Sequence, residues 1–97
     1  MANVLELDQA ARAFHALSDP TRLRIMRYLA QEPLSPAELS RRLRLRAPTV
    51  THHLRILRLA GLVNMRLGEG GVTKTYAARL EAVSSTFDSL GDFLAKG

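Results

Sequence analysis

Cysteine and tryptophan are both absent from this chain of 97 residues. Without cysteine the chain cannot form a disulfide, a thiolate metal site or a thiol redox switch, so those functions are excluded. Long apolar runs are also missing: none approaches the ~18 residues that cross a bilayer, and no basic segment followed by an apolar one marks the N-terminus. We therefore expect no membrane span and no secretion signal, and we expect a cytoplasmic protein.

Acidic residues are scarce in the middle of the chain, where basic residues gather. Residues 1–38 hold four basic and five acidic side chains, residues 39–79 hold nine and one, and residues 80–97 hold one and three. Seven arginines lie between Leu39 and Gly68, with no Asp or Glu to neutralise them. The alternative is that these arginines are ordinary exposed residues of helix surfaces without a binding role. In that case acidic residues would be expected among them. The middle segment is therefore the predicted footprint for a polyanion.

Two short amphipathic helices are predicted within this basic segment. Apolar residues recur three, four or seven positions apart inside 37–43 and 47–60, at Leu39, Leu43, Val50, Leu54 and Leu57. Ser35 and Glu38 form a capping-box pattern that starts the first helix at Pro36, and Gly61 closes the second. Two helices joined by a tight turn and basic on the outside predict a helix-turn-helix that meets a phosphate backbone.

The second of these helices is the predicted reader of DNA. A rotation of ~100° per residue places Thr51, His52 and Arg55 opposite the apolar stripe, and its N-terminal turns would face base edges in a major groove. The adjacent pair His52 and His53 points in two directions and cannot readily share a metal ion, so we expect His52 on DNA and His53 against the scaffold. Leu59 points outward, either as a stray exposed leucine or as a contact for a partner.

A hairpin follows this helix. Val63 to Leu67 alternates as a half-buried strand does, Gly68–Gly71 is a turn, and Val72 to Ala77 is rich in β-branched and aromatic residues. Arg66 and Lys74 flank the tip and would reach the DNA backbone or a minor groove. A hairpin that merely covers the core is the alternative. The predicted DNA-binding residues are Arg46, Ala47, Thr49, Thr51, His52, Arg55, Arg66 and Lys74.

Two further helices are predicted before the basic segment. The first spans 6–17. The second spans 21–31 after the start signal Ser18-Asp19-Pro20. In the second helix the apolar period predicts Leu23, Met26, Leu29 and Ala30 on the buried side, with Arg22, Arg24 and Arg27 on the remaining sides.

The last helix, 80–95, carries an apolar seam that steps by three and four residues. Two heptads are too short for a free coiled coil, so the seam must pack on something. A single 97-residue domain has a thin core that pairing would stabilise, and the simplest use of the seam is a dimer interface shared with residues 6–17. Packing only within its own domain is the alternative. The predicted interface residues are Leu7, Phe14, Leu80, Val83, Phe87, Leu90 and Leu94.

These motifs together resemble the ArsR-type winged helix-turn-helix repressors over nearly the whole chain. The resemblance lies in SDPTRLRIMRYL (18–29), AELSRRL (37–43), PTVTHHLRIL (48–57), AGLV (60–63) and a hairpin ending at Tyr76. It implies a mainly α fold with a small β-hairpin, in the order α-α-α-α-β-β-α. It also implies a homodimer, held by its first and last helices, that binds a two-fold operator and releases it when an effector binds.

The sequence departs from that family at residues that bear on sensing. Ser35 and Ala37 stand where metal-sensing members carry a cysteine pair, and Asp88 and Asp92 of the last helix have no histidine beside them. We therefore predict no metal and no other cofactor. Arg44 stands where a glycine is usual: either Arg44 is strained at positive φ by ~1 kcal/mol and the added charge toward DNA compensates, or the turn takes another shape. Arg46 replaces a usual capping serine, so the recognition helix lacks a side-chain cap.

The combined prediction is a dimeric, sequence-specific DNA-binding transcriptional regulator, with a repressor favoured. One alternative is a winged helix used for protein contact, and another is the DNA-reading part of a larger regulator. An enzyme is the weakest reading, because the sequence shows no glycine-rich phosphate loop and no nucleophile with a nearby base. The sequence does not specify the operator or the effector.

Overall fold

The computed structural model describes residues 4–96, which form five helices and one hairpin. The elements are α1 (Val4–Leu17), α2 (Pro20–Gln31), α3 (Pro36–Leu43), α4 (Ala47–Leu59), β1 (Val63–Leu67), a 3-10 turn η1 (Glu69–Gly71), β2 (Lys74–Ala78) and α5 (Leu80–Ala95). The predicted order α-α-α-α-β-β-α is confirmed. The second strand begins at Lys74 and not at Val72, because Gly70 and Gly71 take positive φ and lengthen the turn.

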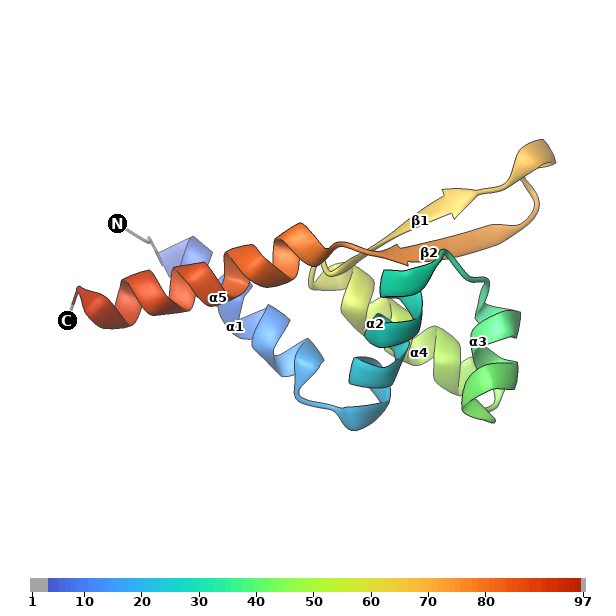
Figure 1. Cartoon of the computed structure of the whole chain (residues 1–97), viewed down its shortest axis with the longest axis horizontal. Coiled ribbons are helices and arrows are strands. Elements are labelled where there is room, and N and C mark those ends of the chain that lie inside the picture. Colours follow the sequence, from blue (N-terminus) through green and yellow to red (C-terminus); the bar gives the residue numbers. More distant parts are fainter. Residues whose placement is uncertain (1–3, 97) are drawn as a thin grey trace.

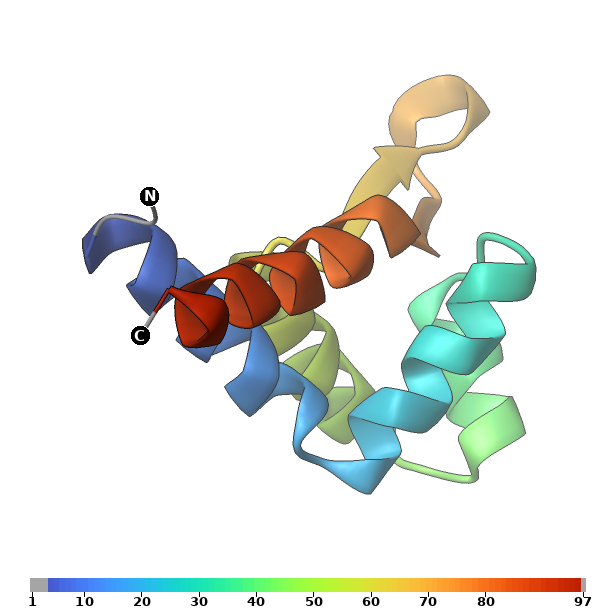
Figure 2. The same cartoon turned by 60° about the vertical axis from the view of Figure 1, so that its left-hand side comes forward.

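The molecule is elongated, with extents of 47 × 28 × 21 Å. Figure 1 shows α1 and α5 together at one end, and α2, α3, α4 and the hairpin at the other. Figure 2 shows α5 crossing over α1 at that end of the molecule. None of the helices in residues 4–96 has the length and apolar character needed to cross a membrane.

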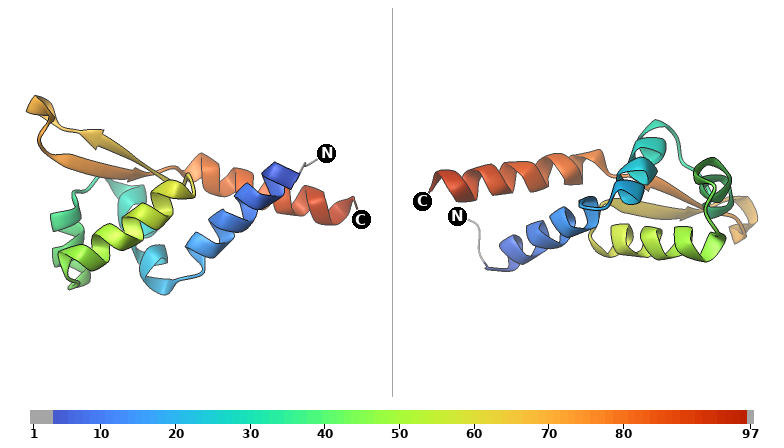
Figure 3. Two further views of the ribbon diagram at one scale, coloured as in Figure 1. Left: turned by 180° about the vertical axis from the view of Figure 1, so that it is seen from behind. Right: turned by 90° about the horizontal axis from the view of Figure 1, so that it is seen from below.

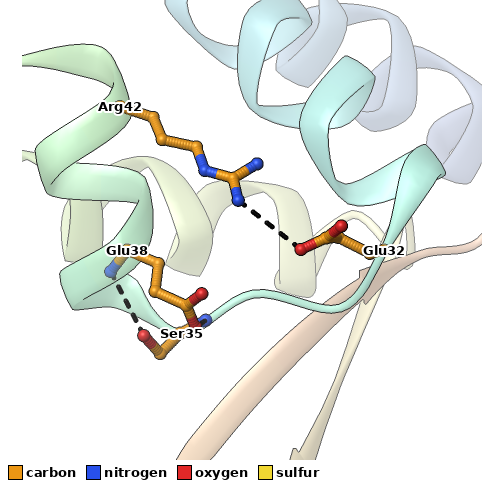
Figure 4. Close-up of polar contacts among 4 residues, drawn as sticks. All are labelled: Glu32, Ser35, Glu38 and Arg42. Carbon is orange, nitrogen blue, oxygen red and sulfur yellow. Dashed lines mark hydrogen bonds and ion pairs between the residues drawn. The ribbon is translucent and has the colours of Figure 1, made fainter.

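Helices α2 and α3 start at the side-chain caps that the sequence predicted. Asp19 accepts a hydrogen bond from the backbone N–H of Arg22 at 3.0 Å and so caps α2. Ser35 and Glu38 form a reciprocal capping box at the start of α3: the Ser35 N–H donates to Glu38 Oε1, and the Glu38 N–H donates to Ser35 Oγ, both at 3.1 Å (Figure 4). The hydrogen bond from the Ser35 N–H lowers the pKa of Glu38.

The core joins α1, α2, α3, α4 and the base of the hairpin. Its buried apolar residues are Ala13, Ala16, Ile25, Met26, Leu29, Leu34, Leu39, Val50, Leu54, Leu57, Leu62 and Val63. The predicted inward residues of α3 and α4 are confirmed as core or half-buried. One face was predicted wrongly: Leu23 is 51% exposed and Ala30 is exposed, whereas Arg22 is buried. Arg22 can be buried because its donors find partners, as described below.

The hairpin is tied to the helices by a backbone bridge that the sequence did not reveal. Leu34, in the linker between α2 and α3, donates its N–H to the carbonyl of Tyr76 at 3.0 Å and accepts from the Tyr76 N–H at 2.8 Å. Leu34 is fully buried. A single apolar residue between two prolines has no period, so periodicity cannot predict this contact.

Helix α5 packs along α1 but has no fully buried residue. Phe14 of α1 meets Phe87 of α5 edge to face, with ring centroids 5.3 Å apart and planes at 81°. Leu80, Phe87, Phe93 and Leu94 remain 47–65% exposed. The two terminal helices therefore contact each other within one chain and still present apolar surface to solvent.

Candidate nucleic-acid interface

Helix α4 lies at the surface with one side in the core and the other open. Val50, Leu54 and Leu57 are buried against the scaffold, and Thr51 and Arg55 are exposed on the opposite side. Seen from behind, α4 crosses the front of the molecule, with α3 beside its N-terminal end and the hairpin above (Figure 3). The outer side of the first turns of α4 is thus open to solvent, as groove entry by a recognition helix requires.

All eight predicted DNA-binding residues are exposed. Six of them lie at the start and on the outer side of α4, and Arg66 and Lys74 lie on β1 and β2. None of the eight side chains forms a hydrogen bond or ion pair with another residue of the described range 4–96; His52 has only a tilted ring contact with His53. Their donors are therefore available to an external partner.

The arginines of the basic segment are free with one exception. Six of the seven, Arg41, Arg44, Arg46, Arg55, Arg58 and Arg66, are exposed and form no ion pair within the part of the chain that the structure describes. The prediction of an unneutralised segment is wrong at Arg42, which lies 3.5 Å from Glu32 of the α2 end (Figure 4). Its guanidinium also stands 5.6 Å from the Tyr28 ring centre. Arg42 of α3 therefore contacts both Tyr28 and Glu32 at the C-terminal end of α2.

The turn between α3 and α4 has the strained residue that the sequence predicted. Arg44 ends α3 in the left-handed region, at φ 55° and ψ 44°, and its N–H donates to the Ser40 carbonyl. Ser40 Oγ donates to the Leu45 carbonyl and holds the turn closed. Arg46 precedes α4 without a side-chain cap, as predicted, and only its carbonyl accepts from the N–H groups of Thr49 and Val50.

A buried guanidinium fixes α4 to the rest of the fold. Arg22 Nε donates to the Ala16 carbonyl at 2.6 Å, and Nη2 donates to the His15 carbonyl at 3.4 Å. Nη1 lies 3.2 Å from Nδ1 of His53, so that ring nitrogen is the acceptor. The predicted placement of His53 against the scaffold is confirmed, and burial lowers the pKa of its imidazole.

Sequence reasoning missed Arg22, although a signal was present. A cation in the first turn of a helix opposes the helix dipole. Arg22 lies there in α2, three residues after the cap Asp19, and an unfavourable local position suggests a compensating contact elsewhere. The C-terminal carbonyls of α1 supply that contact, because they are the negative end of their own helix.

The hairpin does not bring Arg66 and Lys74 to one face. Arg66 pairs with Thr75 across the ladder, whereas Lys74 pairs with Leu67. Neighbouring positions of a strand point to opposite faces, so Arg66 and Lys74 lie on opposite sides of the hairpin. A DNA duplex that lies along one face of the hairpin would contact only one of these two cations. It would contact both only if the hairpin tip enters a groove.

Residues 4–96 hold no cluster of three or more His, Cys, Asp or Glu that could bind a metal ion. Asp88 and Asp92 are both exposed on α5. The open face of α4, the hairpin beside it and the helix pair at the far end define a winged helix-turn-helix protein.

Comparison with known proteins agrees with this class. Residues 17–66 match a family described as a helix-turn-helix domain. The chain is 44% identical to a transcriptional repressor SmtB homolog of Synechocystis, over 65% of this chain and 50% of that protein. An ArsR-like regulator from Rhodococcus has the same fold, with a TM-score of 0.86 and 28% identity, over 96% of this chain and 86% of that one. A domain from Mycobacterium bovis described as a homodimeric winged helix-turn-helix DNA-binding domain matches with a TM-score of 0.72 and 27% identity, over 93% and 81%.

The chain belongs to the ArsR-type winged helix-turn-helix transcriptional regulators. That family consists of regulators of transcription and not of enzymes. The match spans half the length of the Synechocystis repressor.

Proposed function

We propose that this chain is a sequence-specific DNA-binding regulator that acts as a symmetric dimer in the cytoplasm and represses transcription by occupying a two-fold operator. The observation that carries the proposal is the open outer side of α4. Its polar and basic side chains are exposed and unpaired within residues 4–96, and the uncapped first turn stands at the edge of the molecule. Free donors presented by a surface helix are what direct readout of a major groove requires.

In the proposed complex α4 enters the major groove by its N-terminal turns. Arg55 and Arg46 donate to guanine or to phosphate, Thr49 and Thr51 contact base edges or phosphate, and His52 donates to an acceptor on either. Arg66 and Lys74 of the hairpin contact the backbone from opposite sides of the tip. Specificity is therefore assigned to α4, and the hairpin supplies general affinity.

The dimer is proposed from the terminal helices. Leu80, Phe87 and Leu94 are more than half exposed, and Leu7, Phe14, Val83 and Leu90 are only partly buried where α1 meets α5. A second copy would cover this apolar surface, and the Mycobacterium bovis relative is described as homodimeric. Two α4 helices related by a two-fold axis would read half-sites about one helical turn, ~34 Å, apart.

Selection of bound fragments from genomic DNA, followed by fluorescence anisotropy at several salt concentrations, tests the proposal. A palindromic consensus and an affinity that falls steeply with salt are expected, because each neutralised phosphate releases counterions. Affinity that is independent of salt, or fragments with no shared sequence, would contradict it.

A second candidate is the DNA-reading part of a larger regulator. It is favoured by one observation, that the match covers half of the Synechocystis repressor. The selected consensus would then be the same, and release from DNA would depend on a portion of the regulator outside these 97 residues.

A further inference from the structure

A second basic surface lies on the outer side of α2. A groove of about 530 Å³ is lined by Arg24, Arg27, Tyr28, Gln31, Arg42 and Leu43. The four α2 residues are spaced i, i+3, i+4 and i+7, so they share one face of that helix. The volume falls within the range of small-molecule sites.

The groove lies on the far side of the molecule from the DNA-reading side chains. Ile25, Met26 and Leu29 of α2 are buried in the same core as Val50 and Leu54 of α4. At 100° per residue, the groove residues of α2 lie on the opposite side of the helix from those buried positions. Figure 1 shows α2 in front of α4, and the view from behind in Figure 3 shows α4 in front. About two helix diameters, roughly 20 Å, therefore separate the groove from a duplex seated on α4.

The groove contains positive charges that have no acidic partner in the described residues. Arg24 and Arg27 are exposed, and neither side chain forms an ion pair or hydrogen bond within residues 4–96. Arg42 closes the α3 side, where Glu32 and the Tyr28 ring hold it in place (Figure 4). Of the three guanidinium groups that line the groove, only that of Arg42 has a carboxylate partner.

We propose that the groove binds a small phosphorylated molecule. Arg24 and Arg27, one turn apart on one helix face, would hold the phosphate, because guanidinium forks match phosphate oxygens in bidentate pairs. Tyr28 and Leu43 offer apolar surface to the rest of the ligand, and the Gln31 amide offers both a donor and an acceptor. A concave site lined from two helices favours a small molecule over the flat surface of an acidic protein. This inference does not rest on the proposed DNA function.

Calorimetric titration of the whole chain with pyrophosphate, at constant ionic strength, tests the proposal. The double variant Arg24→Gln/Arg27→Gln should weaken pyrophosphate binding about tenfold or more, since two charge-assisted contacts are lost. Arg55→Gln/Arg58→Gln is the matched control, because it removes the same charge from exposed positions of α4. The control should keep its affinity for pyrophosphate and lose affinity for DNA, whereas the groove variant should keep its affinity for DNA. Thermal melts followed by circular dichroism establish that both variants fold.

Four outcomes would overturn the proposal. Wild-type protein that takes up no pyrophosphate at millimolar concentration has no such site. Equal weakening in both double variants would mean that overall charge alone attracts the anion. Binding of poly-glutamate without binding of pyrophosphate would assign the groove to an acidic protein. Loss of DNA binding in the groove variant, to the same degree as in the control, would assign it to the DNA footprint. Protein that binds pyrophosphate in the groove but no DNA would refute only the proposed function.

Discussion

Arg22 is a charged residue that the core tolerates because each of its three guanidinium nitrogens has an acceptor within hydrogen-bond distance. The guanidinium joins the carbonyls of His15 and Ala16 to the imidazole of His53, and so connects the end of α1 with α4. The contact runs between residues 31 positions apart in sequence, which no local period encodes. The hydrophobic pattern predicted that Arg22 is exposed and Leu23 is buried, and the structure shows the reverse. Arg22 can be buried because hydrogen bonds to its guanidinium offset the cost of removing the charge from water.

Replacement of Arg22 should therefore destabilise the fold. Arg22→Met keeps most of the side-chain volume but removes the guanidinium donors of the Ala16 carbonyl and of the His53 imidazole nitrogen, whereas the His15 carbonyl keeps its two donors from Ser18. We expect the free energy of unfolding to fall by about 2–4 kcal/mol. Urea denaturation measures the change, and Arg24→Met, at an exposed position of the same helix, should stay within about 0.5 kcal/mol of the wild type. Equal effects of the two substitutions would show that the buried contacts contribute nothing.

His53 should make stability depend on pH near neutrality. Burial lowers the pKa of His53 from 6.5; Asp19 opposes that shift, and the charges of Arg22 and His52 add to it. The unfolded chain thus binds the proton more readily than the folded one, so the His53 contribution is complete above pH 6.5 and is lost as the pH falls from 6.5 through the folded pKa. Urea midpoints between pH 5 and 8 should rise with pH, and His53→Gln should flatten the rise. The carboxyls of Asp19 and Glu38, whose pKa values are lowered from 3.8 and 4.5, titrate below this range.

At the scale of helices and strands, the sequence predicted most of what the structure contains. The apolar periods place all five helices, the capping box starts α3 at Pro36, and β1 matches its predicted bounds. What periodicity could not supply are contacts between elements: the Leu34–Tyr76 bridge, the Arg42–Glu32 pair and the opposite faces of Arg66 and Lys74. Each of these contacts depends on how two elements pack or pair with each other. The periodicity of one segment carries no information about its packing against another.

The turn before α4 offers a test of local strain. Arg44 occupies the left-handed region, where a residue with a Cβ is disfavoured by about 1 kcal/mol. Arg44→Gly should stabilise the protein by roughly 0.5 kcal/mol, because the greater chain entropy of unfolded glycine offsets part of the relief. The same change at Arg41, inside α3, should instead cost about 1 kcal/mol. Thermal denaturation of the two variants checks the opposite signs, and a destabilised Arg44→Gly would contradict the strain.

Helix and hairpin should differ in what they contribute to DNA binding. Arg55→Ala should relax sequence preference, with a loss of about 1–3 kcal/mol on the selected operator and little loss on unrelated DNA. Lys74→Ala should weaken all sequences alike and reduce the slope of log affinity against log salt by about 1. Anisotropy titrations with operator and scrambled duplexes at three salt concentrations separate the two. Identical profiles for both variants would rule out the division of roles between α4 and the hairpin.

At the scale of the whole molecule, the proposed dimer accounts for the apolar surface at the α1–α5 end. Leu80→Glu/Leu94→Glu alters two α5 residues that are 53% and 65% exposed, so the fold of one chain should survive the change. Light scattering after size exclusion should give twice the chain mass of 10.7 kDa for the wild type and a single chain mass for this variant. Val72→Glu is the control, because Val72 is 82% exposed between η1 and β2, in the hairpin at the other end of the molecule from α1 and α5 (Figure 1), and its substitution should leave the dimer intact. A wild type that is monomeric at micromolar concentration, or a dimer that survives both glutamates, would mean that a different surface joins the subunits or that none does. Operator affinity should fall with the dimer, because one recognition helix contacts one half-site and loses the benefit of the second.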